Sequence, residues 1–279
     1  MTNDLREIAA TTSPLETYQE SMADLIKVLQ QLEPAQWNLS TPCPGWSIAD
    51  IAAHLIDLDA MAMGAPRIDH EPDWDSLPHV TTRSHQFTER GVDYRRGTPP
   101  TELLDQLVVT TQSLSDYVLS DSLSANKVGI TVPWAKDELS TEVFLGMRAF
   151  DVWVHEQDIR NAIGQPGNLG SNAARSSAQR MFSSIPLIWG KKVGAPIGSS
   201  LTLKITGPDI LGDLTVSVHP DGRAKLIDPV GSAENSVTMS WPEFADAFAG
   251  RVPVETTKSQ ATFTGDLAET FISSLASTP

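Results

Sequence analysis

The sequence predicts a two-domain α+β protein, with an N-terminal antiparallel four-helix bundle and a small C-terminal domain built on a mostly antiparallel sheet. From residue 14 to about residue 190, apolar residues recur every three or four positions, as they do on one face of a helix. Beyond residue 195 they alternate with polar residues, as in a half-buried strand. We therefore expect a flexible N-terminus over 1–13, a bundle over 14–192 and a small domain over 199–279.

The first three bundle helices are marked by their start and stop signals. Pro34 ends the first helix, because proline cannot continue one. Ser47 is a good N-cap for the second helix. The third helix follows Pro99, after a long connection over 64–98 in which we expect one short helix near 83–94.

The remaining helical segments are less regular. Residues 121–138 have no clear period and are expected to be irregular. A fourth helix is expected over about 140–163, with Gly164 directly after it. A fifth is expected over 171–189, weakened by Pro186.

In the last 80 residues, the alternation of apolar and polar residues and the turn signals predict short strands and two helices. Pro242 should open one helix, and Asp266 should cap a closing helix. A Pro-Asp-Gly turn at 220–222 predicts a hairpin. Strands are expected over 201–205, 214–218, 224–226, 237–239 and 262–264.

Composition excludes several function classes. With 35 acidic and 20 basic residues the net charge is −15, which disfavours nucleic-acid and anionic-membrane partners. No apolar run is long enough to span a membrane, and the first ten residues do not form a signal peptide. The single cysteine, Cys43, excludes an intrachain disulfide and a multi-cysteine zinc site. We expect a cytoplasmic protein, and a monomer.

Titratable side chains on apolar helix faces indicate a site. His54 lies on the buried side of the second helix, and Asp151 and His155 share one face of the fourth because they are four residues apart. Two histidines and one carboxylate match open zinc sites and the facial triad of non-haem iron. The alternatives are a core histidine bonded to a backbone carbonyl and an ordinary helix ion pair.

Two further carboxylates compete for the acidic position. Asp158 follows His155 by three residues and could replace Asp151. Glu156 points about 100° away from His155 around the helix, so we expect it on the surface or beside the ligands. The other histidines lie in loop-like or turn-adjacent sequence and are not expected to be ligands: His70, His79, His85 and His219.

Three segments carry a resemblance to a known family. The stretches WNLSTPCPGWSIADIAAHL (37–55) and RAFDVWVHEQDIRNAIG (148–164) resemble two signatures of mycothiol-dependent maleylpyruvate isomerase-like proteins, which are DinB-like metal-binding four-helix bundles. The segment TFTGDLAETFISSLASTP (262–279) resembles the end of their accessory domain, which is similar to sterol-carrier folds. The resemblance covers nearly the whole chain and is least distinct over 64–140.

The resemblance implies one divalent metal, usually taken as zinc, held by His54, Asp151 and His155. The better-known form has glutamate where this chain has Asp151, which puts the identity of the metal in doubt. It also implies mycothiol, the low-molecular-weight thiol of actinobacteria, as cosubstrate. A thiol bound to a divalent cation ionises near neutral pH. Its thiolate would isomerise maleylpyruvate to fumarylpyruvate by addition, rotation and elimination, or would attack an electrophile and stay attached, as in an S-transferase.

A dicarboxylate substrate needs cations, and arginine binds carboxylates with two parallel hydrogen bonds. The candidates are Arg148 and Arg223 for catalysis and Arg160 for cofactor binding. Arg148 could equally form a helix ion pair with Asp151, and Arg223 could be a solvated turn residue. Cys43 is interpreted either as a thiol of lowered pKa or as a packing residue.

The tryptophans near the motifs, Trp37, Trp46 and Trp153, are expected to be core or helix-start residues rather than platforms for substrate. Two alternatives to an enzyme stay open. One is a non-catalytic metal-binding or regulatory protein of the same fold. The other is a lipid carrier, suggested only by the C-terminal resemblance.

Overall fold

The computed structural model describes residues 4–120, 139–228 and 233–277, so the expected irregular segment over 121–138 lies outside it. The chain divides into two compact units, Thr12–Gly167 and a second unit that joins Met1–Thr11 to Asn168–Pro279. The expected bundle range of 14–192 extends beyond the first unit. Residues 168–192 group with the second unit because helix α6 (Asn172–Ser183) packs against elements of that unit.

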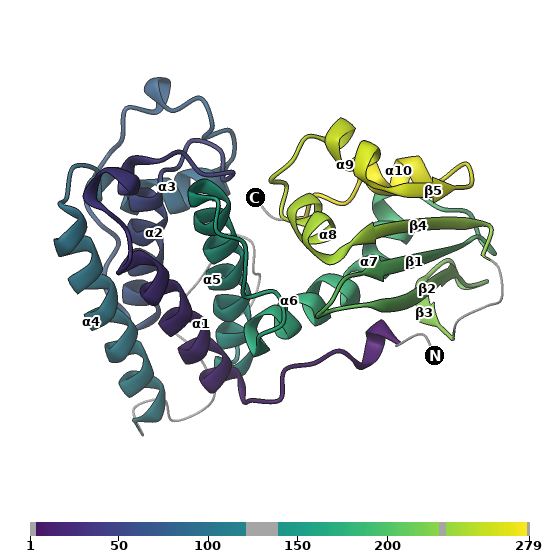
Figure 1. The fold of residues 1–279 in the computed structure, drawn as a ribbon, viewed down its shortest axis with the longest axis horizontal. Coiled ribbons are helices and arrows are strands. Elements are labelled where there is room, and N and C mark those ends of the chain that lie inside the picture. Colours follow the sequence, from purple (N-terminus) through teal and green to yellow (C-terminus); the bar gives the residue numbers. More distant parts are fainter. Residues whose placement is uncertain (1–3, 121–138, 229–232, 278–279) are drawn as a thin grey trace. The chain divides into compact units, whose positions relative to one another are not determined.

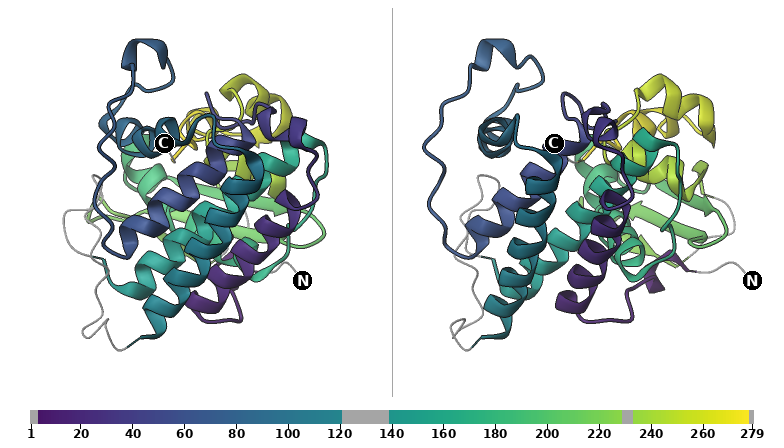
Figure 2. Two further views of the ribbon diagram at one scale, coloured as in Figure 1. Left: turned by 90° about the vertical axis from the view of Figure 1, so that its left-hand side faces the viewer. Right: turned by 60° about the vertical axis from the view of Figure 1, so that its left-hand side comes forward.

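Within the described residues of the first unit, four long helices lie side by side (Figures 1 and 2). Helix α1 packs against α5 and α4, and α2 packs against α4 and α5. A shorter helix, α3, lies against α2 in the expected place. The bounds are α1 Pro14–Leu29, α2 Ile48–Ala62, α3 Arg83–Arg95, α4 Pro100–Leu119 and α5 Thr141–Ile163.

Local signals in the sequence explain where these helices begin and end. Ser13 and Ser47 each start a helix with a capping box, in which the hydroxyl and the third helical residue satisfy the free backbone N–H groups. Ser140 caps α5, and Gly164 ends it in a left-handed conformation with φ 66°. Helix α2 is buried along most of its length, so any polar residue on it meets the core.

The second unit contains a five-stranded sheet in the order β3-β2-β1-β4-β5. All neighbouring pairs are antiparallel except β1 and β4, which confirms the expected mostly antiparallel sheet. The register places Leu203 of β1 opposite both Leu214 and Val237, in the buried layer. The bounds are β1 Ser200–Thr206, β2 Gly212–Val218, β3 Ala224–Ile227, β4 Asn235–Ser240 and β5 Thr262–Thr264.

Short helices accompany this sheet. Helix α8 (Trp241–Phe248) packs on β1 and β4, and α10 (Ala268–Ser273) packs on β4 and β5. Helix α9 (Val254–Gln260) was not predicted, because its sequence VETTKSQ has no apolar stripe. Asp266 does not cap α10, which starts after Leu267 without a side-chain cap. Pro186 does interrupt the fifth helix, leaving a short α7 (Ile185–Leu187) and a π-helical turn over Ile188–Lys192.

Residues near the N-terminus pack within the second unit, although a flexible segment was expected. Leu5 is buried. The backbone of Asp4 forms an isolated parallel β-bridge with Asp213 of β2. The backbone N–H and hydroxyl of Thr11 donate to Asn172 at the start of α6. In the described part of the chain, no helix is long and apolar enough to cross a membrane.

Candidate metal centre

The structure brings together the three residues expected as ligands. His54 is on α2, and Asp151 and His155 are one turn apart on α5. One ligand atom from each lies within 4.8 Å of the other two. Nε2 of His54 is 3.3 Å from one carboxylate oxygen of Asp151, and Nε2 of His155 is 3.6 Å from the other. The two imidazoles meet edge to face, with their centroids 5.0 Å apart.

His54 is a buried polar side chain without a hydrogen bond. It is 4% exposed, and within the described residues neither ring nitrogen has a hydrogen-bond partner. Burial lowers the pKa of this imidazole, so the ring is neutral and carries a free lone pair at neutral pH. An unsatisfied buried polar group is costly, and a bound cation would remove that cost. The alternative of a core histidine bonded to a backbone carbonyl therefore does not describe His54.

His155 is held differently, by a carboxylate on its own helix. Its Nδ1 lies 3.0 Å from Asp158, which is buried. Such a partner directs Nε2 toward a metal and raises its basicity. Asp158 is therefore placed as the partner of His155. Glu156 is buried rather than on the surface, and it accepts a hydrogen bond from Nε of Arg160 at 2.7 Å.

Asp151 is connected to a buried polar chain through Arg148. The Arg148 guanidinium pairs with the Asp151 carboxylate, and its Nε donates to Asp59 on α2 at 2.8 Å. The Tyr18 hydroxyl on α1 donates to the second oxygen of Asp59 at 2.6 Å. Burial opposes ionisation of Asp151, yet its interactions with His54 and with the charged Arg148 hold the pKa of this carboxyl below its ordinary value. The carboxylate is thus anionic at neutral pH, as a metal ligand must be.

The three arginines expected at a substrate or cofactor lie in different surroundings. Arg148 is only 3% exposed and already pairs with two carboxylates, which favours a role in orienting Asp151. Arg160 pairs with Glu156 near the end of α5. Arg223 belongs to the second unit, where its side chain is exposed after the hairpin turn. Their roles toward a substrate stay predictions.

Two residues of the turn over 43–46, before α2, lie at the candidate centre, although the sequence favours packing roles for both. The Trp46 indole packs against both candidate ligands, with centroid distances of 4.8 Å to His54 and 5.8 Å to His155. Cys43 is 8% exposed and lies within 4.8 Å of ligand atoms of His155 and Asp158. The signal was the short spacing between this turn and His54, since the first turns of a helix lie close to the residues that enter it.

These residues fit a divalent metal. Two imidazole nitrogens and one carboxylate oxygen form the mixed N/O donor set of catalytic zinc sites, which leave a position open. The orphaned nitrogens of His54, the anionic Asp151 and the partner at His155 each meet a requirement for ligands.

Comparison with solved structures finds the same fold in a known enzyme. The crystal structure of the mycothiol-dependent maleylpyruvate isomerase is similar over 90% of this chain and 91% of that chain, with a TM-score of 0.56 and 17% identity. A histidine-to-alanine mutant of that isomerase matches with a TM-score of 0.54. At this identity the likeness shows the fold alone.

Curated relatives come from Mycobacterium tuberculosis. An uncharacterized protein of strain CDC 1551 and one of strain H37Rv are each 26% identical to this chain over 219 residues, covering 76% of it and 78% of their own length. The family model described as the mycothiol maleylpyruvate isomerase N-terminal domain matches residues 18–160, which is more than half of the chain. The chain therefore belongs to the family of proteins that carry the mycothiol maleylpyruvate isomerase N-terminal domain.

Proposed function

We propose that this protein is a metal-dependent enzyme that uses mycothiol on a small electrophile, either as a maleylpyruvate cis–trans isomerase or as a mycothiol S-transferase. The observation that carries the proposal is the buried His54, whose two ring nitrogens have no hydrogen bond within the described residues, facing Asp151 and His155. The family adds the thiol, because its model is named for mycothiol.

The proposed ligands are His54, Asp151 and His155, and zinc is the expected metal. A divalent cation held there would lower the pKa of a coordinated thiol so that the thiolate exists near neutral pH. The protein's own residues prepare the site. Asp158 orients the ring of His155, and Arg148 keeps Asp151 ionised and in place.

The two reactions begin with formation of the same S–C bond. The thiolate sulfur adds to the electrophilic carbon of the conjugated double bond, and the π electrons move onto the carbonyl oxygen. In an isomerase, rotation about the carbon–carbon bond that has become single, followed by cleavage of the S–C bond, re-forms the double bond as the trans alkene and returns the thiolate. In a transferase, protonation leaves the thioether as product. The expected cationic contacts to substrate carboxylates, by Arg148, Arg160 or Arg223, are part of this proposal.

The metal is tested by elemental analysis of the purified full chain. Wild type should hold about one divalent metal per chain, and His54→Ala should lose it because one of three protein ligands is gone. His85→Ala is the matched control, because the His85 ring contacts Thr81 and the backbone of His79 instead of the candidate ligands. Undiminished zinc in His54→Ala would contradict the ligand assignment.

The orienting carboxylate gives a second, graded test. Asp158→Asn keeps the shape of the side chain but weakens the partner of His155 Nδ1. Loss of such a partner typically costs about 10–100-fold in metal affinity. Zinc affinity is measured by competition with a chromophoric chelator. An affinity equal to that of wild type would show that Asp158 does not support a ligand.

The reaction is tested with mycothiol and a panel of electrophiles, maleylpyruvate first. Isomerisation without consumption of thiol identifies the isomerase, whereas loss of thiol with formation of an adduct identifies the transferase. Bound metal with no turnover of any electrophile would refute the enzyme and favour the alternative, a non-catalytic metal-binding or regulatory protein of the same fold.

A further inference from the structure

The two histidines of the candidate centre differ in what orients them. His155 has Asp158 at Nδ1, which is the usual arrangement for an imidazole ligand. His54 has no hydrogen bond at either nitrogen within the described residues. In that part of the chain, the one polar contact of this ring is between Nε2 and the candidate ligand Asp151 at 3.3 Å, so Nδ1 lacks the orienting partner that His155 has.

Among the described residues, the aromatic ring nearest to His54 is the Trp46 indole. Its ring is tilted by 44° against His54 at a centroid distance of 4.8 Å, and it reaches His155 as well. Trp46 is 8% exposed, so this contact is packed within the protein. Aromatic pairs at such distances contribute to stability beyond the area they bury, and they restrict how either ring can turn.

Trp46 is itself held by a buried carboxylate on another helix. Its Nε1 donates to Glu89 of α3 at 2.7 Å, and Glu89 is only 1% exposed. A hydrogen bond to a charged acceptor is stronger than one between neutral groups. The indole therefore cannot rotate without leaving a buried carboxylate short of a donor.

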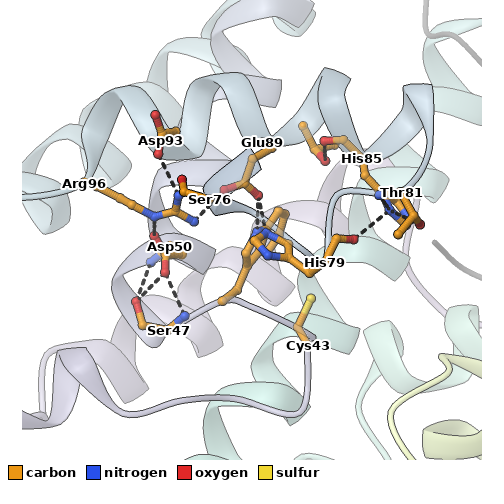
Figure 3. A network of polar contacts seen from close by, with 12 residues as sticks. Cys43, Ser47, Asp50, Ser76, His79, Thr81, His85, Glu89, Asp93 and Arg96 are labelled. Atoms are coloured by element: carbon orange, nitrogen blue, oxygen red, sulfur yellow. Dashed lines mark hydrogen bonds and ion pairs between the residues drawn. The ribbon is translucent and has the colours of Figure 1, made fainter. Parts of the chain in front are cut away.

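Glu89 is held in place by a network that reaches back to the helix of His54 (Figure 3). Arg96 donates to Glu89 at 2.5 Å, and Nε2 of His79 is 3.0 Å from the same carboxylate. Nε of Arg96 also donates to Asp50 at 3.1 Å. Asp50 belongs to the capping box that starts α2. Arg96 therefore connects the start of that helix to Glu89, the residue that accepts from Trp46.

Gly45 allows this network to close around the turn. Its φ of +79° suits glycine, and a Cβ there would lie 2.3 Å from the His79 ring. His79 therefore packs directly on the backbone beside Trp46. The turn over 43–46, helix α3 and the first turn of α2 are in this way held together by side-chain contacts.

We propose that Trp46 orients the His54 imidazole by ring packing in place of a hydrogen bond, and that Glu89 is the positioning residue that holds Trp46. The role is tested first on the metal-free protein, by the ¹H–¹³C NMR signal of the His54 ring, assigned by its absence in His54→Ala. Because the shift depends on the ring current of Trp46, it reports the relative angle of the two rings.

The variants are Glu89→Leu, which removes the acceptor, and Glu89→Gln, which keeps an acceptor oxygen. Surface controls come from Glu71, which accepts from Trp74 Nε1 at 2.6 Å and pairs with Arg90, so it repeats the same indole–carboxylate–arginine arrangement away from the centre. We expect Glu89→Leu to move the His54 signal and to weaken zinc binding about 10-fold. Glu89→Gln should restore most of both, and Glu71→Leu should change neither.

A folded Glu89→Leu protein with an unmoved His54 signal would overturn the role of Glu89. A moved signal with unchanged zinc affinity would overturn the role of Trp46 in orienting a ligand. If Glu89→Leu does not fold, Trp46→Phe decides, because it removes both the Nε1–H that Glu89 accepts and part of the ring that packs on His54. Zinc affinity equal to wild type would then overturn the proposal. If the wild type binds no zinc, the proposed function fails, while the NMR signal still tests the ring packing.

Discussion

Asp59 is the buried carboxylate on which the polar chain behind the candidate centre depends. Its side chain is fully buried, and it accepts hydrogen bonds from Arg148 at 2.8 Å and from Tyr18 at 2.6 Å. Asp59→Ala removes both acceptors and leaves the Arg148 guanidinium, which is 3% exposed, with Asp151 as its remaining carboxylate. We expect the free energy of unfolding to fall.

The size of the loss in the free energy of unfolding can be estimated in two ways. Removing one partner of a buried ion pair costs about 3–5 kcal/mol. Two hydrogen bonds that involve a charged group, at about 1.5–3 kcal/mol each, give a similar loss. Because Asp151 still compensates part of the Arg148 charge, we expect a loss near the lower end, about 3 kcal/mol.

The assay is urea unfolding of the full chain at pH 7 with a metal chelator present, followed by far-UV circular dichroism. Tyr18→Phe removes one of the two hydrogen bonds and should cost about half as much. Lys225→Ala, which removes a half-exposed ion pair with Asp221 on the second unit, should cause no measurable change. A loss below about 1 kcal/mol in Asp59→Ala would refute the reasoning, because it would show that Arg148 does not need this carboxylate.

Two further predictions concern α3. Gly91→Ala should lower the free energy of unfolding by about 1–3 kcal/mol, since a Cβ there would lie 2.2 Å from the buried Asp57 carboxylate. Gly146→Ala is the control, because among the described residues nothing outside its own stretch of helix lies within 4 Å of the new Cβ; it should raise the free energy of unfolding by about 0.5–1 kcal/mol. Equal effects of the two variants in urea unfolding would contradict the packing. For Asp93, burial opposes ionisation, but hydrogen bonds from His70 and Arg96 hold the pKa of the carboxyl below its ordinary value. The ionised folded form thus stabilises the protein above the unfolded pKa of about 4, and this contribution is lost as the pH falls below it; Asp93→Asn should flatten the decline of stability in acid, and an unchanged slope of stability against pH would count against it.

The sequence predicted the candidate ligands because each depends on a local rule. A four-residue spacing places Asp151 and His155 on one face, and the apolar neighbours of His54 indicate the buried side of its helix. The sheet was predictable for the same reason, since alternation over 201–205 and 214–218 reports burial of one face.

What the sequence could not show are contacts between distant segments. Arg148 and Asp59 are 89 residues apart, and Glu89 meets Trp46 across 43 residues, so no spacing rule pairs them. A partial signal existed: Asp59 is one turn after Leu55 on an apolar helix, the same argument that selected His54. The polar helix α9 was missed because its formation depends on packing against α8 and α10 rather than on its own pattern.

The second unit is discontinuous along the chain, since Leu5 and Thr11 pack with residues beyond 168. During synthesis, all of Thr12–Gly167 emerges from the ribosome before the partners of Leu5 exist. The early segment must therefore wait, with an apolar side chain exposed, while the helical unit is completed. A fusion partner or a truncation at this end would act on the stability of the sheet unit, more than 150 residues away in sequence, rather than on the helices that directly follow it.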